Sequence, residues 1–144
     1  MKTIGIIGTR RRDSEEDFLL VKEVFLKIYE DLDVICSGLC PQGGDWFAVL
    51  LSLGKDYVHD PVERKRILNK VHEGSIRYVR PCQWFPADWP KYGKGAGFIR
   101  NRYIAEESHI LIACVAEDRK GGTEDTIRKF RKKLRFTDSK LILV

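Results

Sequence analysis

Four glycine-rich turns carry the residues of this sequence that are best suited to binding a phosphate. The turns are Gly8-Thr9-Arg10-Arg11, Ser37-Gly38 through Gly43-Gly44-Asp45, Gly93 to Gly97 with Arg100-Asn101 behind it, and Gly121-Gly122-Thr123. Glycine lets backbone N–H groups approach an anion without a Cβ in the way, and the N-terminus of a following helix adds a positive end. Thr9, Ser37 and Thr123 add hydroxyl donors. A single such turn is often only a turn, so it is their recurrence after successive strands that predicts a site.

Arg10 and Arg100 are the cations that we expect to hold this phosphate. A guanidinium group can grip an anion with two parallel hydrogen bonds, whereas lysine acts as a point charge. Arg11 and Arg12 are expected to be solvated or to flank a helix. Asp45 has two interpretations, because it either caps the helix that it begins or accepts hydrogen bonds from ribose hydroxyls.

Three aromatic residues lie in the proline-rich segment before the third glycine turn. Trp84, Phe85 and Trp89 can stack on a base, an interaction worth about 1–3 kcal/mol per base in nucleic-acid binders. They can equally pack the segment against the sheet, and we expect at least one of them to do so.

Short apolar runs alternate with amphipathic segments along the chain. The expected strands cover residues 3–8, 34–36, 76–79, 109–115 and 140–144, and the expected helices begin at 13–16, cover 46–53, start at Pro61, and cover 97–107 and 122–134. The first helix has an N-cap and an acidic first turn in Asp13-Ser14-Glu15-Glu16. Residues 54–74 form a charged helical excursion, and 81–96 form an aromatic, proline-rich loop rather than a regular element.

This alternation predicts the α/β class, with a Rossmann-like open and mostly parallel sheet of about five strands and helices on both faces. In such sheets ligands bind outside the carboxyl ends of the strands, at a topological switch point. A chain of 144 residues is within the usual size of one domain, so residues 1–144 are expected to form a single nucleotide-binding domain.

The composition favours an intracellular protein with an anionic ligand. The formal net charge is +5, and no apolar run is long enough to cross a bilayer, so we expect a cytoplasmic location and no membrane partner. The cysteines at 36, 40, 82 and 114 are expected to be reduced thiols, and their spacing predicts no metal site.

Taken in order, these motifs resemble the SLOG superfamily of Rossmann-like nucleotide-binding proteins, in particular its short YspA-like branch. Ile6-Ile7-Gly8-Thr9-Arg10 is similar to that branch's opening Gly-Ser/Thr-Arg, and Ala96 to Asn101 is similar to its Ala-Gly-x-x-Arg-Asn. Ser37-Gly38-Leu39 and Gly43-Gly44-Asp45 resemble its Ser-Gly-Gly and Gly-Ala-Asp pair. The resemblance spans nearly the whole chain and departs most in the 54–74 excursion.

The resemblance implies a pocket for nucleotides, ADP-ribose derivatives or cytokinin-like nucleoside monophosphates, in a homodimer or higher oligomer and without a further cofactor. The implied ligand-binding residues are Gly8, Thr9, Arg10, Ser37, Gly38, Gly43, Gly44, Asp45, Gly97, Arg100, Asn101, Gly122 and Thr123. The favoured function is that of a sensor, or of a sequestering protein that removes a nucleotide second messenger, as SLOG domains in antiviral signalling and the proteins opposing them are thought to do. If a virus encodes the protein, it acts in the host cytosol.

The first alternative is an N-glycosidase similar to the lonely-guy phosphoribohydrolases. That family carries Pro-Gly-Gly-x-Gly-Thr-x-x-Glu, and laying its Gly-Thr on Gly122-Thr123 places Asp118-Arg119-Lys120 at Pro-Gly-Gly and Thr126 at the glutamate. Glu124 or Asp125 would then have to substitute as the catalytic carboxylate. A displacement of about 1 Å can cost ~10²-fold in rate, so hydrolysis is not favoured.

The second alternative is single-stranded nucleic-acid binding, as in the related DNA-processing proteins. It is supported by the basic residues of the last helix and the residue that follows it, Arg128, Lys129, Arg131, Lys132, Lys133 and Arg135. Such a run is more often a solvated helix face, with Ile127, Phe130 and Leu134 turned to the core. Nucleic acid therefore ranks last among the expected partners.

Overall fold

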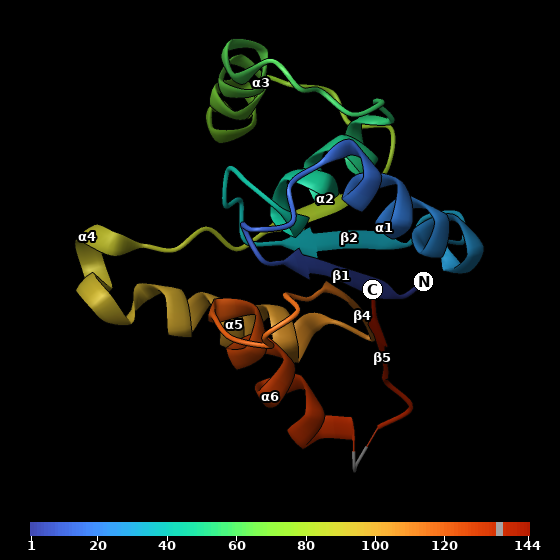
Figure 1. Ribbon diagram of the computed structural model, residues 1–144, viewed down its shortest axis with the longest axis vertical. Coiled ribbons are helices and arrows are strands. Elements are labelled where there is room, and N and C mark those ends of the chain that lie inside the picture. Colours follow the sequence, from blue (N-terminus) through green and yellow to red (C-terminus); the bar gives the residue numbers. More distant parts are fainter. Residues whose placement is uncertain (135–136) are drawn as a thin grey trace.

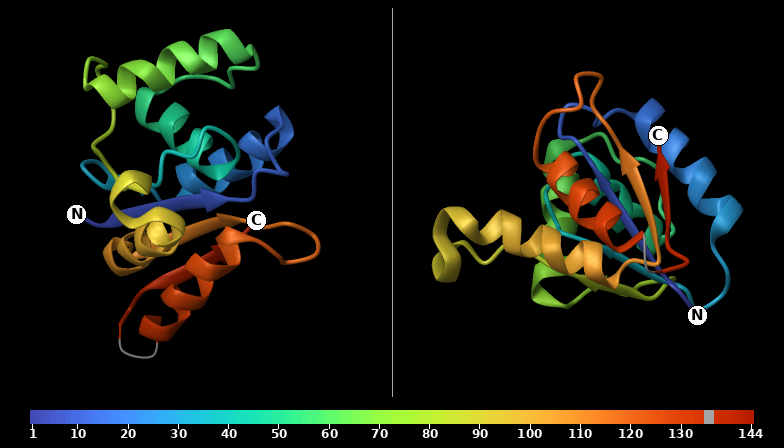
Figure 2. Two further views of the ribbon diagram at one scale, coloured as in Figure 1. Left: turned by 90° about the vertical axis from the view of Figure 1, so that its left-hand side faces the viewer. Right: turned by 90° about the horizontal axis from the view of Figure 1, so that it is seen from below.

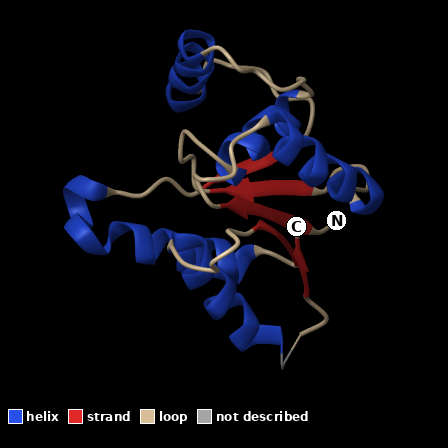
Figure 3. Ribbon diagram, in the orientation of Figure 1, coloured by secondary structure: helices blue, strands red, loops and turns tan. Residues whose placement is uncertain are grey.

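The opening apolar run forms the central strand of a five-stranded parallel sheet. A computed structural model describes residues 1–134 and 137–144 of the chain. Its strands are β1 (Thr3–Gly8), β2 (Val34–Ser37), β3 (Cys82–Trp84), β4 (Ile110–Cys114) and β5 (Lys140–Leu143). Their order is β3-β2-β1-β4-β5, and every neighbouring pair is parallel. All carboxyl ends therefore meet at one edge of the sheet (Figure 3). This confirms the predicted α/β class and the Rossmann-like open sheet.

Helices cover both faces of the sheet (Figure 1). Helices α1 (Glu15–Ile28) and α2 (Gly44–Leu53) lie on one face, and α5 (Ala96–Glu107) and α6 (Gly122–Leu134) lie on the other. The short helix α4 (Trp89–Tyr92) and the 3-10 turn Gly93–Gly95 project from the body ahead of α5, as Figure 2 shows. Helix α3 (Pro61–Glu73) lies outside α2.

The helix boundaries follow the capping signals of the sequence. The Ser14 side chain accepts a hydrogen bond from the Asp17 amide, and the Asp17 carboxylate accepts one from the Ser14 amide, so α1 begins with a complete capping box. Asp60 caps α3 at its N-terminus, and Pro61 follows at the first helical position. Each cap satisfies amides that have no partner inside the helix, which fixes where the helix starts.

Helix α2 forms the centre of the larger of two apolar cores. Every residue from Gly44 to Leu53 is buried, because β1 lies beneath the helix and the excursion covers its outer side. The second core lies between the sheet and helices α5 and α6, around Leu111, Ile127 and Phe130. The two faces therefore bury apolar side chains independently, and β1 is buried on both sides.

The third strand lies later in the chain than the sequence pattern predicts. Residues 76–79 form no strand; instead, the Val79 amide donates to the carbonyl of Ser52 at the end of α2. The strand that pairs with β2 is instead Cys82–Trp84. Just before it, the carbonyl of Pro81 accepts a hydrogen bond from the Ile35 amide. The prediction that 81–96 lacks regular structure is also wrong, since this segment contains β3, α4 and the start of α5.

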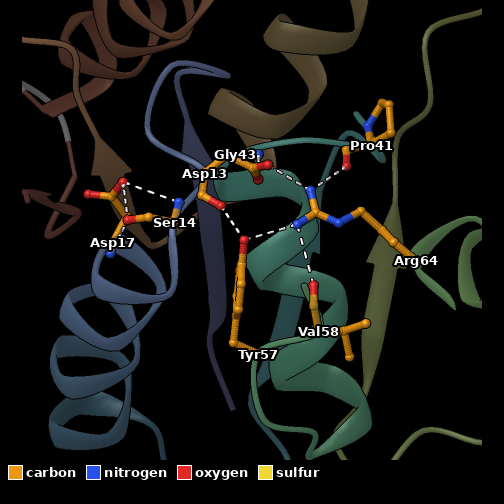
Figure 4. A network of polar contacts seen from close by, with 8 residues as sticks. All are labelled: Asp13, Ser14, Asp17, Pro41, Gly43, Tyr57, Val58 and Arg64. Carbon is orange, nitrogen blue, oxygen red and sulfur yellow. Dashed lines mark hydrogen bonds and ion pairs between the residues drawn. The ribbon is translucent and has the colours of Figure 1, made fainter. Parts of the chain in front are cut away.

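Arg64 holds the helical excursion of residues 54–74 against the rest of the domain (Figure 4). An Arg64 nitrogen lies 2.7 Å from an oxygen of Asp13, and the other oxygen of Asp13 accepts from the Gly43 amide at the N-terminus of α2. The Tyr57 hydroxyl donates to the Asp13 carbonyl and accepts from Arg64. The guanidinium also lies 5.0 Å from the ring centre of Trp46. Arg64 therefore ties α3 to the starts of both α1 and α2.

Within residues 1–134 and 137–144, no helix has the combination of length and apolar composition that crossing a lipid bilayer requires.

Candidate functional site

The predicted turns surround a cavity of about 370 Å³ at the carboxyl edge of the sheet. The strand order reverses between β1 and β4, so the turns that follow these two strands run to opposite faces and leave a crevice between them. Helices α2 and α5 close its sides. The lining residues are Ile7, Gly8, Thr9, Arg10, Arg11, Cys40, Asp45, Arg100, Asn101, Ile104, Lys120, Gly121, Gly122, Thr123 and Thr126.

The turn after β1 and the N-terminus of α6 face each other across this cavity. The Thr9 amide donates to the carbonyl of Cys114 at the end of β4, which holds the two turns together. Around Gly122 the backbone is open, since a Cβ built there would meet nothing within 4 Å. The first amides of α6 can therefore approach an anion, and the helix dipole favours negative charge at this place.

The cavity is strongly cationic. Four of its lining side chains, Arg10, Arg11, Arg100 and Lys120, are basic, against the single carboxyl group of Asp45. Arg11 is held by both oxygens of Asp118, at 2.8 Å each. Among the described residues, Arg10 has no hydrogen-bond or ion-pair partner, so its guanidinium is available to a ligand.

Arg100 reaches the cavity across the backbone of Gly38. A Cβ at position 38 would lie 2.4 Å from Cδ of Arg100 and 3.1 Å from Oδ2 of Asp45, so only glycine leaves room for the arginine. The Nε of Arg100 donates to the side-chain oxygen of Asn101 at 3.3 Å. The contacts within the described chain leave the terminal nitrogens of Arg100 free to donate to a bound group.

Asp45 is a buried carboxyl group at the floor of the cavity. Its side chain is held by the Ser37 hydroxyl at 2.7 Å and by the Cys40 amide at 3.0 Å. Burial raises the pKa of Asp45 above its ordinary value, although Ser37, the charge of Arg100 and the amides of Cys40 and Gly38 act in the opposite direction. Asp45 is in the first turn of α2 but does not cap it, because Gly43 holds the N-cap position and the carboxyl group accepts from the Cys40 amide instead. The predicted capping role is therefore wrong, and the ribose-binding role stays a prediction.

The two carboxylates considered for hydrolysis do not line the cavity. Glu124 pairs with Arg119 at 2.8 Å. Asp125 accepts from Asn101 at 3.1 Å and from Lys129 at 2.6 Å, and it also pairs with Arg128. Burial alone would raise the pKa of Asp125, but its bonds to Lys129 and Asn101 and the charge of Arg128 lower it. Asp125 therefore joins α6 to α5 and positions Asn101.

The three aromatic residues also lie outside the cavity lining. The Trp84 indole donates to the Tyr78 hydroxyl at 3.1 Å and packs against the larger core. Phe85 stacks on Tyr103 with ring centres 5.8 Å apart. Trp89 is exposed at the start of α4. The structure thus shows packing for Trp84 and Phe85, and places Trp89 on the projecting segment.

Eight of the thirteen predicted ligand-binding residues line the cavity: Gly8, Thr9, Arg10, Asp45, Arg100, Asn101, Gly122 and Thr123. The other five are outside its lining: Ser37, Gly38, Gly43, Gly44 and Gly97. Ser37 and Gly38 act through Asp45 and Arg100. Gly43 and Gly44 bring the N-terminus of α2 onto β1, as their closest contacts with Thr9 and Ile7 show.

Several lining residues were not predicted from the sequence. Arg11 was expected to be solvated or to flank a helix, and its side chain is indeed 56% exposed, but it also lines the cavity and bridges the turn after β1 to Asp118 and to the Lys120 carbonyl. Arg12 flanks a helix as predicted, because it pairs at 2.9 Å with Asp17 in the first turn of α1, and it also donates to the carbonyl of Val115. Cys40, Lys120 and Thr126 also line the cavity, but none of them belongs to a glycine motif. Their proximity to such turns was the only available signal.

A larger hollow of about 1110 Å³ lies between α1 and the excursion. Its wall includes the acidic first turn of α1 as well as Tyr57, His59, Arg64 and His72. The wall of this hollow has no glycine turn, and the guanidinium of Arg64 in it already pairs with Asp13. The smaller cavity therefore fits an anion better. Among the described residues, no group of three or more His, Cys, Asp or Glu side chains is placed to hold a metal ion.

The chain matches no protein-family model, no curated protein and no solved structure.

Proposed function

We propose that the protein binds a phosphate-containing nucleotide ligand in the 370 Å³ cavity and holds it without turnover, as a sensor or a sequestering protein. The observation that carries this proposal is the convergence of Arg10, Arg100 and the N-terminus of α6 on one cavity. The volume lies at the lower end of the range of about 300–1,000 Å³ that is usual for small-molecule sites. The cavity also lies at the switch point, where α/β sheets of this order bind their ligands.

The environment of the acidic residues supports binding rather than hydrolysis. Glu124 and Asp125 are both engaged by cations outside the cavity, and Asp45 is the one carboxyl group in the described lining. An N-glycosidase remains the alternative, and it would release a free base. The biological role that we propose, removal or sensing of a nucleotide second messenger, requires the ligand to be recovered intact.

The first test identifies the ligand and its fate. The purified protein is heat-denatured, and any released nucleotide is identified by mass spectrometry. Fresh protein is then incubated with that compound, or with nucleoside monophosphates and ADP-ribose. We expect the compound to be bound and recovered unchanged. Release of free base that is lost in the Glu124→Gln or Asp125→Asn variant would show a glycosidase instead.

Arg10→Ala and Arg100→Ala are each expected to weaken nucleotide binding by about 10- to 100-fold, since a hydrogen bond to a charged group contributes about 1.5–3 kcal/mol. Isothermal titration calorimetry measures the affinity, and urea unfolding checks that the fold is kept. The matched control is Arg131→Ala, which removes an exposed arginine from the last turn of α6. Wild-type affinity in both cavity variants would remove these arginines from the site.

The basic face of α6 gives less support to nucleic-acid binding than its sequence suggests. Lys129 and Lys133 are bound to groups of the same chain, and Arg128 pairs with Asp125; Arg135 lies outside the described residues. We expect the affinity for a small nucleotide to change little with salt concentration, because only one or two phosphates are neutralised. A titration of a single-stranded oligonucleotide at increasing salt provides the comparison. Tight oligonucleotide binding with a steep salt dependence would favour the nucleic-acid alternative.

A further inference from the structure

The hydroxyl group of Ser37 makes two short contacts that one proton cannot satisfy. Its Oγ lies 2.5 Å from the carbonyl oxygen of Ile6 and 2.7 Å from Oδ1 of Asp45. A hydroxyl has one proton to donate, and a backbone carbonyl can only accept. If Asp45 were ionised, one of these two contacts would bring two acceptors together in a buried place. Both contacts are hydrogen bonds only if the other proton comes from Asp45.

The second oxygen of Asp45 fits the same assignment. Oδ2 accepts from the Cys40 amide at 3.0 Å, as the carbonyl oxygen of a carboxylic acid does. Oδ1 then carries the proton and donates it to Ser37. Asp45 is only 8% exposed, and burial disfavours its charged form, which agrees with this assignment.

We propose that Asp45 is a neutral carboxylic acid in the cavity and that an anionic ligand binds together with this proton. A charged Asp45 would repel a phosphate and would compete with it for the positive charge of Arg100. A neutral Asp45 leaves Arg100 to the ligand, and a bound phosphate in turn makes ionisation of Asp45 more costly. The inference rests on the proposed function and adds that phosphate binding is linked to the protonation of Asp45.

The other charged and titratable groups around Asp45 come from every neighbouring element. They are Cys36 and Cys40 from β2 and the loop after it, Arg100 from α5, Arg10 and Arg11 from the turn after β1, and Lys120 from the turn after β4. Arginine and lysine side chains ordinarily lose their charge only in the alkaline range, and thiols ordinarily gain theirs there. Burial raises the pKa of Cys36 to about 11. Asp45 is therefore the group in this set that changes charge at acidic to neutral pH.

The protonation of Asp45 can be measured without any ligand. A carbon-13 NMR titration of the side-chain carboxyl groups is expected to show Asp45 protonated well above the ordinary value of 3.8. Asp33 is the internal control, because it is also shielded from solvent but its bonds to Lys2 and to the Glu30 amide, opposing the effect of burial, lower its pKa. Titration of Asp45 at or below 3.8 would overturn the inference.

The linkage is tested with ADP-ribose, whose diphosphate diester does not titrate near neutral pH. Calorimetry in buffers of different ionisation enthalpy is expected to show proton uptake, with affinity falling about tenfold per pH unit above the pKa of Asp45. Asp45→Asn should remove both effects, because its amide can donate to Ser37 as the neutral acid does. Asp60→Asn, which keeps the cap of α3, should retain them.

The two proposals fail in different ways. ADP-ribose binding with no dependence on pH would overturn the linkage and leave the nucleotide site standing. If neither ADP-ribose nor any nucleoside monophosphate binds at any pH, the proposed function and the linkage both fail. The NMR titration still decides the charge of Asp45 in that case, and Asp45→Asn is not needed for it.

Discussion

Gly44→Ala is expected to destabilise the protein by about 3 kcal/mol or to prevent it from folding, since overpacking of a well-filled interior costs at least 1–3 kcal/mol. A Cβ on residue 44 would lie 2.1 Å from the carbonyl carbon of Ile7 and 2.3 Å from the amide nitrogen of Gly8. These atoms belong to the backbone of the central strand, so no side chain can rotate away. Relief requires α2 to move off β1, which separates the apolar core and displaces Asp45 from the cavity.

Urea unfolding followed by circular dichroism measures this effect. The control is Gly95→Ala, where a Cβ meets nothing within 4 Å and the backbone is already helical at φ −80°. We expect the control to change the free energy of unfolding by less than about 0.5 kcal/mol. A Gly44→Ala protein as stable as the wild type would mean that α2 does not pack on β1 as described.

Arg64→Ala is expected to lower the free energy of unfolding by about 2 kcal/mol and to release the excursion from the body. Breaking a buried ion pair costs about 3–5 kcal/mol, and the smaller figure applies because the side chains of Arg64 and Asp13 are 12% and 25% exposed. The variant also loses the contact with the Trp46 ring. Faster proteolysis within residues 54–80 should accompany the loss of stability.

Arg66→Ala is the matched control on the same helix. Arg66 makes two short contacts with Glu63, but both side chains are more than one third exposed, and such a pair contributes about 0–1 kcal/mol. A double-mutant cycle with Asp13→Asn isolates the coupling of Arg64 to Asp13. Equal effects of Arg64→Ala and Arg66→Ala would show that the excursion is not fastened through Arg64.

The residues that the sequence placed correctly follow strong local rules. The run from Thr3 to Gly8 is apolar throughout because both faces of its strand are buried, and the cap at Ser14 fixes the start of α1. Glycine turns and parallel strands together predicted that Gly8, Asp45, Arg100 and Gly122 would meet at one edge. This part of the site could be predicted because each of these residues ends a strand or lies in the first two turns of a helix.

The parts that the sequence placed wrongly depend on contacts between distant residues. Residues 76–79 alternate as a half-buried strand does, but Val79 and Arg80 are held by the Ser52 carbonyl at the end of α2. Strand β3 has three residues and pairs on one side only, so it leaves almost no periodic signal. The role of Arg11 depends on Asp118, which is far along the chain and carries no motif.

The position of β1 determines when the protein can complete its fold during synthesis. Ile4 pairs with Ile35 on one side and with Ile110 on the other, so the second partner emerges from the ribosome only after most of the chain has been made. Until then, a nascent chain that has paired β1 with β2 still has one edge of the apolar strand β1 open. Pairings of such high sequence separation form slowly, and open strand edges promote association with other chains. The nascent protein is therefore most exposed to aggregation in the interval before β4 appears.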